Sequence, residues 1–389
     1  MVEGLNITQA GVGKTMPTTI LMVGNFPAGT GYAWNTIEEY FVALGGWSVE
    51  RSGRAVICYP LVQTAPEKFS RRGIEVVEFD FRESSLVEMF QFLRRYGIRI
   101  LYLTDWPVFS LRYLVCRLAG VKRIVVHDRA SGERDVPTGA KRLLKMLINF
   151  WPLVSVDVAI GISDFVQQRL ERVSCLPRRR IVKIWNGVDV EKFAPGADDF
   201  VYDEFGIPKE KKIVLAYSRA NHYKGIGVFI EAADHLVRGA KRDDVVFVFC
   251  GDGPDLAEFR LMVRDRGLSE TFLLPGRASA IDHVLRGVTL VVVPSLWEEG
   301  FGLTVIEAMA TGKVVIASRV GGIVDIIQDA VNGYLVGAGD SRALAERLSV
   351  LLDDGALRQA VGQRARQTVL DRFNIEDKKR ELVQVVTCG

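Results

Sequence analysis

The chain has 389 residues, of which 48% are hydrophobic and 25% charged, so its composition is that of a globular protein and excludes a disordered one. This length is too great for one ordinary core and suits two domains. The 50 basic and 47 acidic residues nearly balance, which argues against a general nucleic-acid binder. The 5 cysteines and 4 histidines are scattered, so the sequence indicates neither a disulfide framework nor a metal cluster, and we expect a cytoplasmic setting.

The first residues carry no apolar periodicity and no apolar secretory segment. We expect residues 1–15 to form a disordered extension. Gly13-Lys14-Thr15 ends like a phosphate-binding loop, but Thr8 stands where that motif requires its first glycine. No apolar run in the chain reaches the roughly 18 residues that are needed to span a bilayer.

From Ile20 onward, short apolar segments alternate with helical patterns, which predicts parallel sheets with crossover helices. Expected strands of the first half are 20–24, 55–59, 75–79, 100–104, 123–127 and 156–160, with a first helix over 34–44. The pattern restarts after Ala194-Pro195-Gly196 with expected strands 213–217, 245–250, 271–274, 290–293 and 314–317. Helices are expected over 227–238, 254–265 and 304–310.

This pattern predicts an α/β protein with two doubly wound, Rossmann-like domains that face each other across a cleft. We expect an N-terminal domain over 16–194 and a C-terminal domain over 195–375. A final helix over 376–389 is expected to cross back to the first domain. Because such sheets bind ligands at the carboxyl ends of their strands, the cleft is the expected site.

The motif from Glu299 to Ala308 follows an expected strand and runs into a helix. Gly300 and Gly302 allow a sharp turn close to a ligand, and the free N–H groups of the helix start favour an anion such as phosphate. Two carboxylates, Glu299 and Glu307, bracket that anion site and suit sugar hydroxyls. A diphosphate between two sugars would use all of these groups. The plain alternative is a strand-to-helix turn with two solvated glutamates.

Two cations follow the first expected strand of the second half, Arg219 and Lys224. A basic pair in this position can hold a diphosphate and offset the charge that it gains as a leaving group. In isolation, two surface cations would be an equally good interpretation.

The second half resembles glycosyltransferase family 4, which has the two-domain GT-B fold. The resemblance covers about half of the chain and is carried by motifs in this order: Trp185-Asn186-Gly187-Val188-Asp189, Cys250-Gly251-Asp252-Gly253-Pro254, Leu274-Pro275-Gly276-Arg277, Pro294-Ser295, the glutamate motif, Val320-Gly321-Gly322 and Asn332-Gly333-Tyr334-Leu335-Val336. The first half is similar only around Gly29-Thr30-Gly31, Val125-Val126-His127 and Gly161-Ile162-Ser163. Thr30 separates two glycines that are adjacent in many members, which leaves the acceptor geometry open.

The resemblance implies that the domain over 16–194 binds the acceptor and that the domain over 195–375 binds the nucleotide sugar. It also implies roles for single residues. Glu307 is expected to bind the ribose hydroxyls and Glu299 the hydroxyls of the donor sugar. Arg219 and Lys224 are expected to bind the diphosphate. His127 is expected to lie near the reacting carbon, and Gly29 and Gly31 near the donor phosphates or the acceptor. Gly276 and Arg277 are expected to flank the base. The residues expected to bind the donor through the glutamate motif are Phe301, Gly302, Leu303 and Thr304. For His127, a buried histidine without a catalytic role is the alternative.

We therefore expect a retaining glycosyltransferase that moves a sugar from a nucleoside diphosphate sugar to a glycan, lipid or small-molecule acceptor, without metal or other cofactor and without nucleic acid. A phosphorylase or sugar-nucleotide epimerase on the same fold, and a non-catalytic nucleotide-sugar binding module, remain alternatives. A dehydrogenase is disfavoured because Gly24-Asn25-Phe26-Pro27 lacks the dinucleotide-binding glycines. Base, sugar, acceptor and oligomeric state are left open.

A segment that mixes basic and apolar residues spans 141–151. It suits the surface of an anionic membrane, which would place the protein at the inner membrane face. The alternative is an ordinary amphipathic helix that packs its apolar face on the first domain. Arg178-Arg179-Arg180 is interpreted as a solvated loop.

Overall fold

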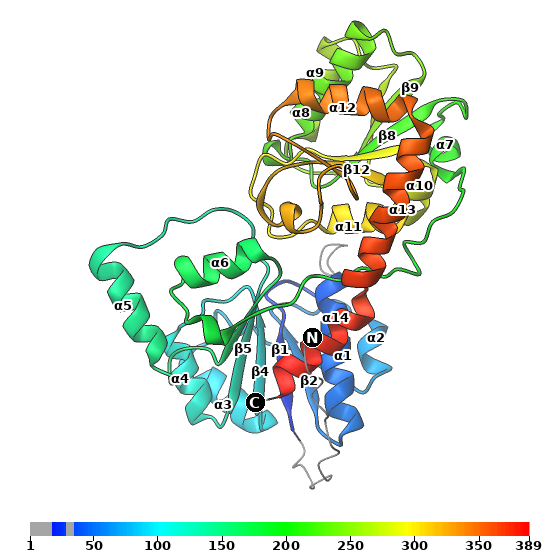
Figure 1. Cartoon of the computed structure of the whole chain (residues 1–389). Helices are drawn as coiled ribbons and strands as arrows, with labels where there is room; N and C mark the ends of the chain where they lie inside the picture. The colour runs from blue at the N-terminus through cyan, green and yellow to red at the C-terminus, as the bar shows by residue number, and fades with distance from the viewer. Residues whose placement is uncertain (1–17, 29–34, 389) are drawn as a thin grey trace, which may run out of the picture. The chain divides into compact units, whose positions relative to one another are not determined.

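The computed structural model describes residues 18–28 and 35–388 (Figure 1). Gly29 and Gly31, the extension over 1–15 and the start of the first expected helix lie outside the described residues. The described chain contains two parallel sheets with helices between the strands, as the alternating pattern predicts.

The first sheet has seven strands in the order β3-β2-β1-β4-β5-β6-β7. Its strands are β1 (Ile20–Val23), β2 (Ala55–Tyr59), β3 (Glu75–Glu78), β4 (Ile100–Thr104), β5 (Arg123–Asp128), β6 (Val158–Gly161) and β7 (Ile181–Lys183). β1 pairs in parallel with β2 and β4. The helices along this part of the chain are α1 (Asn35–Glu50), α2 (Glu67–Ser70), α3 (Leu86–Tyr96), α4 (Leu111–Leu118), α5 (Gly139–Phe150) and α6 (Asp164–Arg172).

The second sheet has six strands in the order β10-β9-β8-β11-β12-β13. Its strands are β8 (Lys212–Tyr217), β9 (Val245–Cys250), β10 (Phe272–Gly276), β11 (Leu290–Val293), β12 (Val314–Ser318) and β13 (Tyr334–Val336). The helices are α7 (Phe200–Phe205), α8 (Ile226–Asp234), α9 (Leu256–Asp265), α10 (Ile281–Gly287), α11 (Leu303–Ala310), α12 (Ser341–Asp353), α13 (Gly355–Arg372) and α14 (Ile375–Thr387).

The core of the second sheet is apolar on both faces because helices cover both. β9 is buried along its whole length, and the ring of its Phe247 packs against Phe229 of α8 and Phe272 of β10. Figure 1 shows α8, α9 and α12 on one side of this sheet and α11 on the other. Continuous apolar strands are the expected consequence of such double coverage.

Local signals in the sequence set several helix ends. Ser85 and Glu88 form a reciprocal capping box at the start of α3, and Gly97 ends that helix with a left-handed backbone, φ 62°. Asp340 and Asp354 accept backbone N–H groups at the starts of α12 and α13.

The strand pattern predicted most strands of both sheets but missed the last strand of each. β7 and β13 have three residues each and lie at sheet edges, so they are too short to give a periodic signal. β6 begins at Val158, two positions later than expected. The two residues before it bond elsewhere, since Val156 N donates to the backbone oxygen of Val108 and Asp157 N donates to that of Ile124 in β5. The helix expected over 227–238 ends its α-helical part at Asp234 and continues as a π-helical turn, His235–Gly239.

The contacts divide the described chain into two compact units. One holds the chain up to Val126, the segment Trp151–Asp157 and the residues from Val383 onward, and the other holds His127–Phe150 and Val158–Leu382. Within the first unit, Arg123 Nη2 donates to the backbone oxygen of Val385, at 2.8 Å, near the end of α14. The last strand of the first sheet ends at Lys183, and the first strand of the second sheet begins at Lys212.

Candidate functional site

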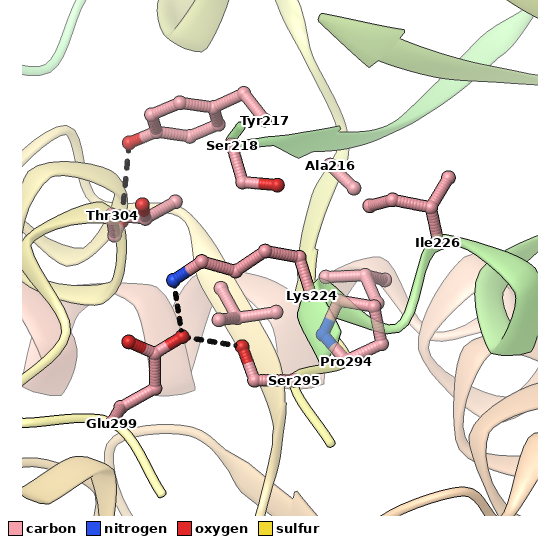
Figure 2. A pocket seen from close by; sticks show the side chains of 11 residues that line it. Ala216, Tyr217, Ser218, Lys224, Ile226, Pro294, Ser295, Glu299 and Thr304 are labelled. Atoms are coloured by element: carbon pink, nitrogen blue, oxygen red, sulfur yellow. Dashed lines mark hydrogen bonds and ion pairs between the residues drawn. The ribbon is translucent and has the colours of Figure 1, made fainter. Parts of the chain in front are cut away.

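A small pocket opens at the carboxyl ends of β8 and β11, two central strands of the second sheet. These strands are neighbours in the sheet although β9 and β10 come between them in sequence, which makes this position the switch point where doubly wound sheets bind ligands. About 270 Å³ of space lies between its lining atoms, including the open solvent at its mouth. Figure 2 shows its lining, which comprises Ala216, Tyr217, Ser218, Lys224 and Ile226 from the β8 side and Val292, Val293, Pro294, Ser295, Glu299 and Thr304 from the β11 side.

Lys224 reaches this pocket because the chain turns sharply after it. His222–Lys224 form one 3-10 turn, and Gly225 then takes a left-handed backbone, φ 71°, before α8 begins. A Cβ on Gly225 would overlap the backbone oxygen of Pro294. Gly225 is therefore required both for its φ and for the close approach of the loops that follow β8 and β11.

Lys224 and Glu299 form an ion pair inside the pocket. Lys224 Nζ donates to Glu299 Oε1 at 2.6 Å, and Ser295 Oγ donates to the same oxygen at 2.6 Å (Figure 2). Their side chains are 26% and 12% exposed, so the pair is partly withdrawn from water. The sequence predicted that both charged residues belong to the site. It gave no role to Ser295, because no local sequence pattern shows that this hydroxyl contacts Glu299.

Glu307 lies in α11 and is 5% exposed. The hydroxyl of Tyr217 lies 2.9 Å from Glu307 Oε2 and 3.1 Å from the backbone oxygen of Thr304, and it can donate to either. Tyr217 is the second residue that sequence reasoning left without a role. Its position as the last residue of β8, followed by the basic segment, is the signal that could have identified it.

The loop between β11 and α11 is held by two glycines from a later motif. Gly321 N donates to a carboxylate oxygen of Glu298, and Gly322 N donates to the backbone oxygen of Glu299 at 2.8 Å. Val320-Gly321-Gly322 therefore supports the loop, and a side chain on Gly321 would overlap the backbone of Glu299.

The start of α11 faces the same pocket through Thr304. Gly302 precedes the helix with φ 126°, and no side chain caps the first turn. The first N–H groups of a helix lack intrahelical partners and favour an anion. Phe301 is 2% exposed and packs edge-on against Phe373, with ring centroids 5.6 Å apart. Its side chain therefore anchors the loop before α11 by packing against Phe373.

His127 lies near the end of β5 and is fully buried. Burial, reinforced by the charge of Arg129, lowers the pKa of His127 well below its usual range, so the imidazole is neutral. The segment that follows it contacts the glutamate loop within one compact unit. Ser131 Oγ accepts from Gly300 N at 2.9 Å, and Gly132 N donates to the backbone oxygen of Glu298 at 2.7 Å.

Three other expected residues, Arg219, Gly276 and Arg277, do not line this pocket. Arg219 is exposed and follows Ser218, which does line it. Gly276 ends β10, where its carbonyl oxygen accepts from Gly251 N at 2.8 Å. Arg277 has a side chain that is 77% exposed, with Nε 3.5 Å from a carboxylate oxygen of Asp252.

The site thus combines a cation, two carboxylates with separate hydroxyl partners, and a helix start. The cation and the helix start suit phosphate oxygens, and the carboxylates suit sugar hydroxyls. Glu299 and Glu307 lie at opposite ends of the glutamate motif, so they can contact different parts of one elongated ligand.

Residues 199–368 match the family model of glycosyl transferases group 1. The N-acetyl-alpha-D-glucosaminyl L-malate synthase of Bacillus anthracis is 28% identical over 265 residues, which are 68% of this chain and 68% of that protein. The D-inositol 3-phosphate glycosyltransferase of Mycolicibacterium smegmatis is 34% identical over 249 residues, which are 61% of this chain and 52% of that protein. The chain therefore spans between half and about two thirds of the length of these relatives.

Solved structures show the same fold over nearly the whole chain. A glycosyltransferase from Rickettsia africae has a TM-score of 0.79 at 19% identity, covering 96% of this chain and 99% of its own. The Anabaena protein HepE, solved in complex with UDP and glucose, has a TM-score of 0.75 at 18% identity, covering 96% of this chain and 100% of its own. At these identities the likeness shows the GT-B fold. Residues 199–368 and the curated relatives thus make the chain similar to glycosyl transferases of group 1, and the described chain has the GT-B fold of the solved glycosyltransferases.

Proposed function

We propose that this chain moves a sugar from a nucleoside diphosphate sugar to an acceptor hydroxyl, with retention of the anomeric configuration. The observation that carries the proposal is the shared pocket of Lys224, Glu299 and Thr304, with Glu307 held by Tyr217 at its edge. We place the diphosphate at Lys224 and the start of α11, the sugar hydroxyls at Glu299 and the ribose hydroxyls at Glu307.

In the proposed reaction, the bond between the anomeric carbon and the diphosphate oxygen breaks and its electron pair stays on the diphosphate. The acceptor oxygen bonds to the same face of the anomeric carbon, and its proton passes to the departing phosphate oxygen. Lys224, Arg219 and the helix start stabilise the charge that develops on the leaving group. Positioning of the two substrates supplies the remaining rate acceleration, so the reaction as proposed requires neither a protein nucleophile nor a metal ion.

His127 fits a neutral hydrogen-bonding role in this proposal because its pKa is lowered well below the usual range. A charged imidazole would compete with the positive character of the reacting carbon. We assign Gly276 and Arg277 to the neighbourhood of the base. Gly29 and Gly31 keep their expected place near the donor phosphates or the acceptor.

The partners of this reaction are proposed by analogy. HepE was solved with UDP, so uridine is the first base to test, and the named relatives suggest small polar acceptors such as malate and inositol 3-phosphate. We also propose a cytoplasmic location with peripheral contact at the inner membrane face, and the surface that supports this contact is described below.

A donor panel tests the proposal directly. Uridine, guanosine and adenosine diphosphate sugars are screened by thermal shift, since a ligand that binds the folded state raises apparent stability. The stabilising donor is then incubated with acceptors, and release of nucleoside diphosphate is measured. Release that depends on an acceptor supports transfer. Turnover that requires inorganic phosphate would indicate a phosphorylase, and sugar isomerisation without any acceptor would indicate an epimerase.

A further inference from the structure

Helix α5 has its polar face toward the protein and its apolar face toward solvent. Lys141, Lys145 and Asn149 are spaced by four residues and so share one face of the helix. Lys145 Nζ donates to the backbone oxygen of Val173 at 2.9 Å. Asn149, the residue of α5 that is buried, donates from Nδ2 to the backbone oxygens of Ser174 at 2.7 Å and Cys175 at 3.1 Å.

The opposite face of α5 is apolar and exposed. Leu143, Leu144, Leu147 and Phe150 are 59%, 58%, 61% and 60% exposed, and Trp151, which follows the helix, is 64% exposed. The interpretation of α5 as a helix that packs its apolar face on the domain is therefore wrong. The hydrogen bonds of its polar face fix it in the reverse orientation.

Cations accompany this apolar face. Arg142 is exposed at the start of α5. At its end, Arg180 Nη1 donates to the backbone oxygen of Asn149 at 2.9 Å, and the Arg179 guanidinium carbon lies 5.8 Å from the centre of the Phe150 ring. No acidic residue occurs in the sequence between Asp135 and Asp157.

We propose that this surface, formed by the apolar face of α5 and by Arg178 and Arg179, docks on a bilayer that contains anionic lipids. Exposed leucines and aromatic rings suit the boundary between headgroups and acyl chains, while flanking cations suit lipid phosphates. The charge complementarity favours this occupant over a second copy of the chain, whose same face would bring like charges together. Among the described residues, no helix combines the length and the hydropathy of a membrane-crossing segment. Because the exposed apolar side chains of α5 lie on one face of the helix, we place α5 in the plane of the membrane interface.

This inference goes beyond the proposed transfer reaction, because lipid binding requires neither donor nor acceptor. It also reassigns the arginine run, which the sequence suggested to be a solvated loop. Lys145 is excluded from the lipid contact because its amine bonds to the backbone of Val173. The exposed leucines and Arg178 and Arg179 are therefore the residues to change.

The test is sedimentation of the full chain with vesicles of phosphatidylcholine alone or mixed with phosphatidylglycerol. The wild type is expected to sediment with the mixed vesicles and to stay in solution with the neutral ones. Leu144→Glu with Leu147→Glu, and separately Arg178→Glu with Arg179→Glu, should each lower the partition coefficient about tenfold or more. Trp151→Phe should remove most of the blue shift of tryptophan fluorescence that accompanies binding.

Leu261→Glu with Val350→Glu is the matched control, because these leucine and valine side chains are 48% and 50% exposed on α9 and α12. This control should bind vesicles like the wild type. Undiminished binding by the leucine variant, or equal loss in the control, would overturn the proposal. A dimer of the wild type in solution that the Leu144→Glu and Leu147→Glu pair dissociates would also overturn it, since a second copy would then cover the surface. Donor binding by thermal shift should be the same in all variants, which separates failure here from failure of the proposed function.

Discussion

Lys224 Nζ lies 2.6 Å from Glu299 Oε1, so the cation expected to hold the diphosphate and the carboxylate expected to hold the sugar form an ion pair with each other. A donor that contacts both must redistribute this pair. Ser295 also donates to Glu299 Oε1, so the carboxylate keeps one hydrogen bond when Lys224 turns to a phosphate. The ion pair and the Ser295 hydroxyl thus fix the positions of both side chains in the pocket.

This arrangement predicts different losses for the two glutamates. Glu307→Ala should weaken binding of the bare nucleoside diphosphate, since we assign Glu307 to the ribose. Glu299→Ala should leave that binding nearly intact, because Lys224 is released to the diphosphate, while transfer falls strongly. Calorimetric titration with the nucleotide and a steady-state assay measure the two effects. Equal weakening of nucleotide binding by both substitutions would contradict the division of roles.

Tyr217→Phe should act through Glu307. The phenol hydroxyl lies 2.9 Å from Glu307 Oε2, and its removal takes one hydrogen bond from a buried carboxylate, which costs about 1.5–3 kcal/mol where the partner is charged. We expect nucleotide affinity to fall about tenfold with the folded structure retained. Titration of the variant with nucleoside diphosphate checks this, and Tyr202→Phe, away from the pocket, is the matched control. An unchanged affinity would remove Tyr217 from the site.

Gly225→Ala should unfold the turn that carries Lys224. The residue has φ 71°, and a Cβ would overlap the backbone oxygen of Pro294. Gly206→Ala is the control, because Gly206 has φ 65° and an added Cβ would have nothing within 4 Å. Its free energy of unfolding should fall only by the about 1–2 kcal/mol that a non-glycine residue costs in a left-handed backbone. Urea unfolding should show a larger loss for Gly225→Ala, with donor binding abolished. Equal losses in both variants would mean that the close approach to Pro294 is unimportant.

Stability should depend on pH through Lys313. Burial lowers the pKa of Lys313 from 10.5 to about 8. Between these pH values the unfolded chain binds a proton that the folded chain does not, so the free energy of unfolding rises with pH across this window. Below pH 8 the amine is charged in both states, and the full cost of burying that charge lowers stability. Relative to Lys313→Met, the wild type should gain about 3 kcal/mol between pH 8 and 10.5. Urea unfolding of both proteins at several pH values measures this gain, and parallel curves would contradict it.

Activity should survive a chelator but not the loss of either cation. In the proposed reaction, Arg219 and Lys224 offset the charge of the departing diphosphate, so Arg219→Ala or Lys224→Ala should slow turnover about ten- to a thousandfold, with less effect on donor affinity. Excess chelator should change the rate little. Arg277→Ala, next to the expected base, should instead affect donor affinity. Loss of activity with chelator and recovery with magnesium or manganese would refute the metal-free proposal.

The sequence by itself determined most of the strands and the loops that carry the candidate site residues. Buried strands such as Val245–Cys250 and Leu290–Val293 have continuous apolar residues, which any double-sided sheet requires. Glycines at sharp turns and a carboxylate at each end of the glutamate motif were also local signals. The short edge strands β7 and β13 gave none.

Only the tertiary structure decided which loops meet and which faces pack. Lys224 and Glu299 are 75 positions apart, and they form a pair because β8 and β11 are neighbours in a strand order that no local pattern encodes. The same holds for Tyr217 and Glu307, 90 positions apart. Periodicity predicted that α5 has a polar and an apolar face, but the direction of those faces depends on the backbone oxygens of Val173, Ser174 and Cys175, which accept hydrogen bonds from its polar side chains.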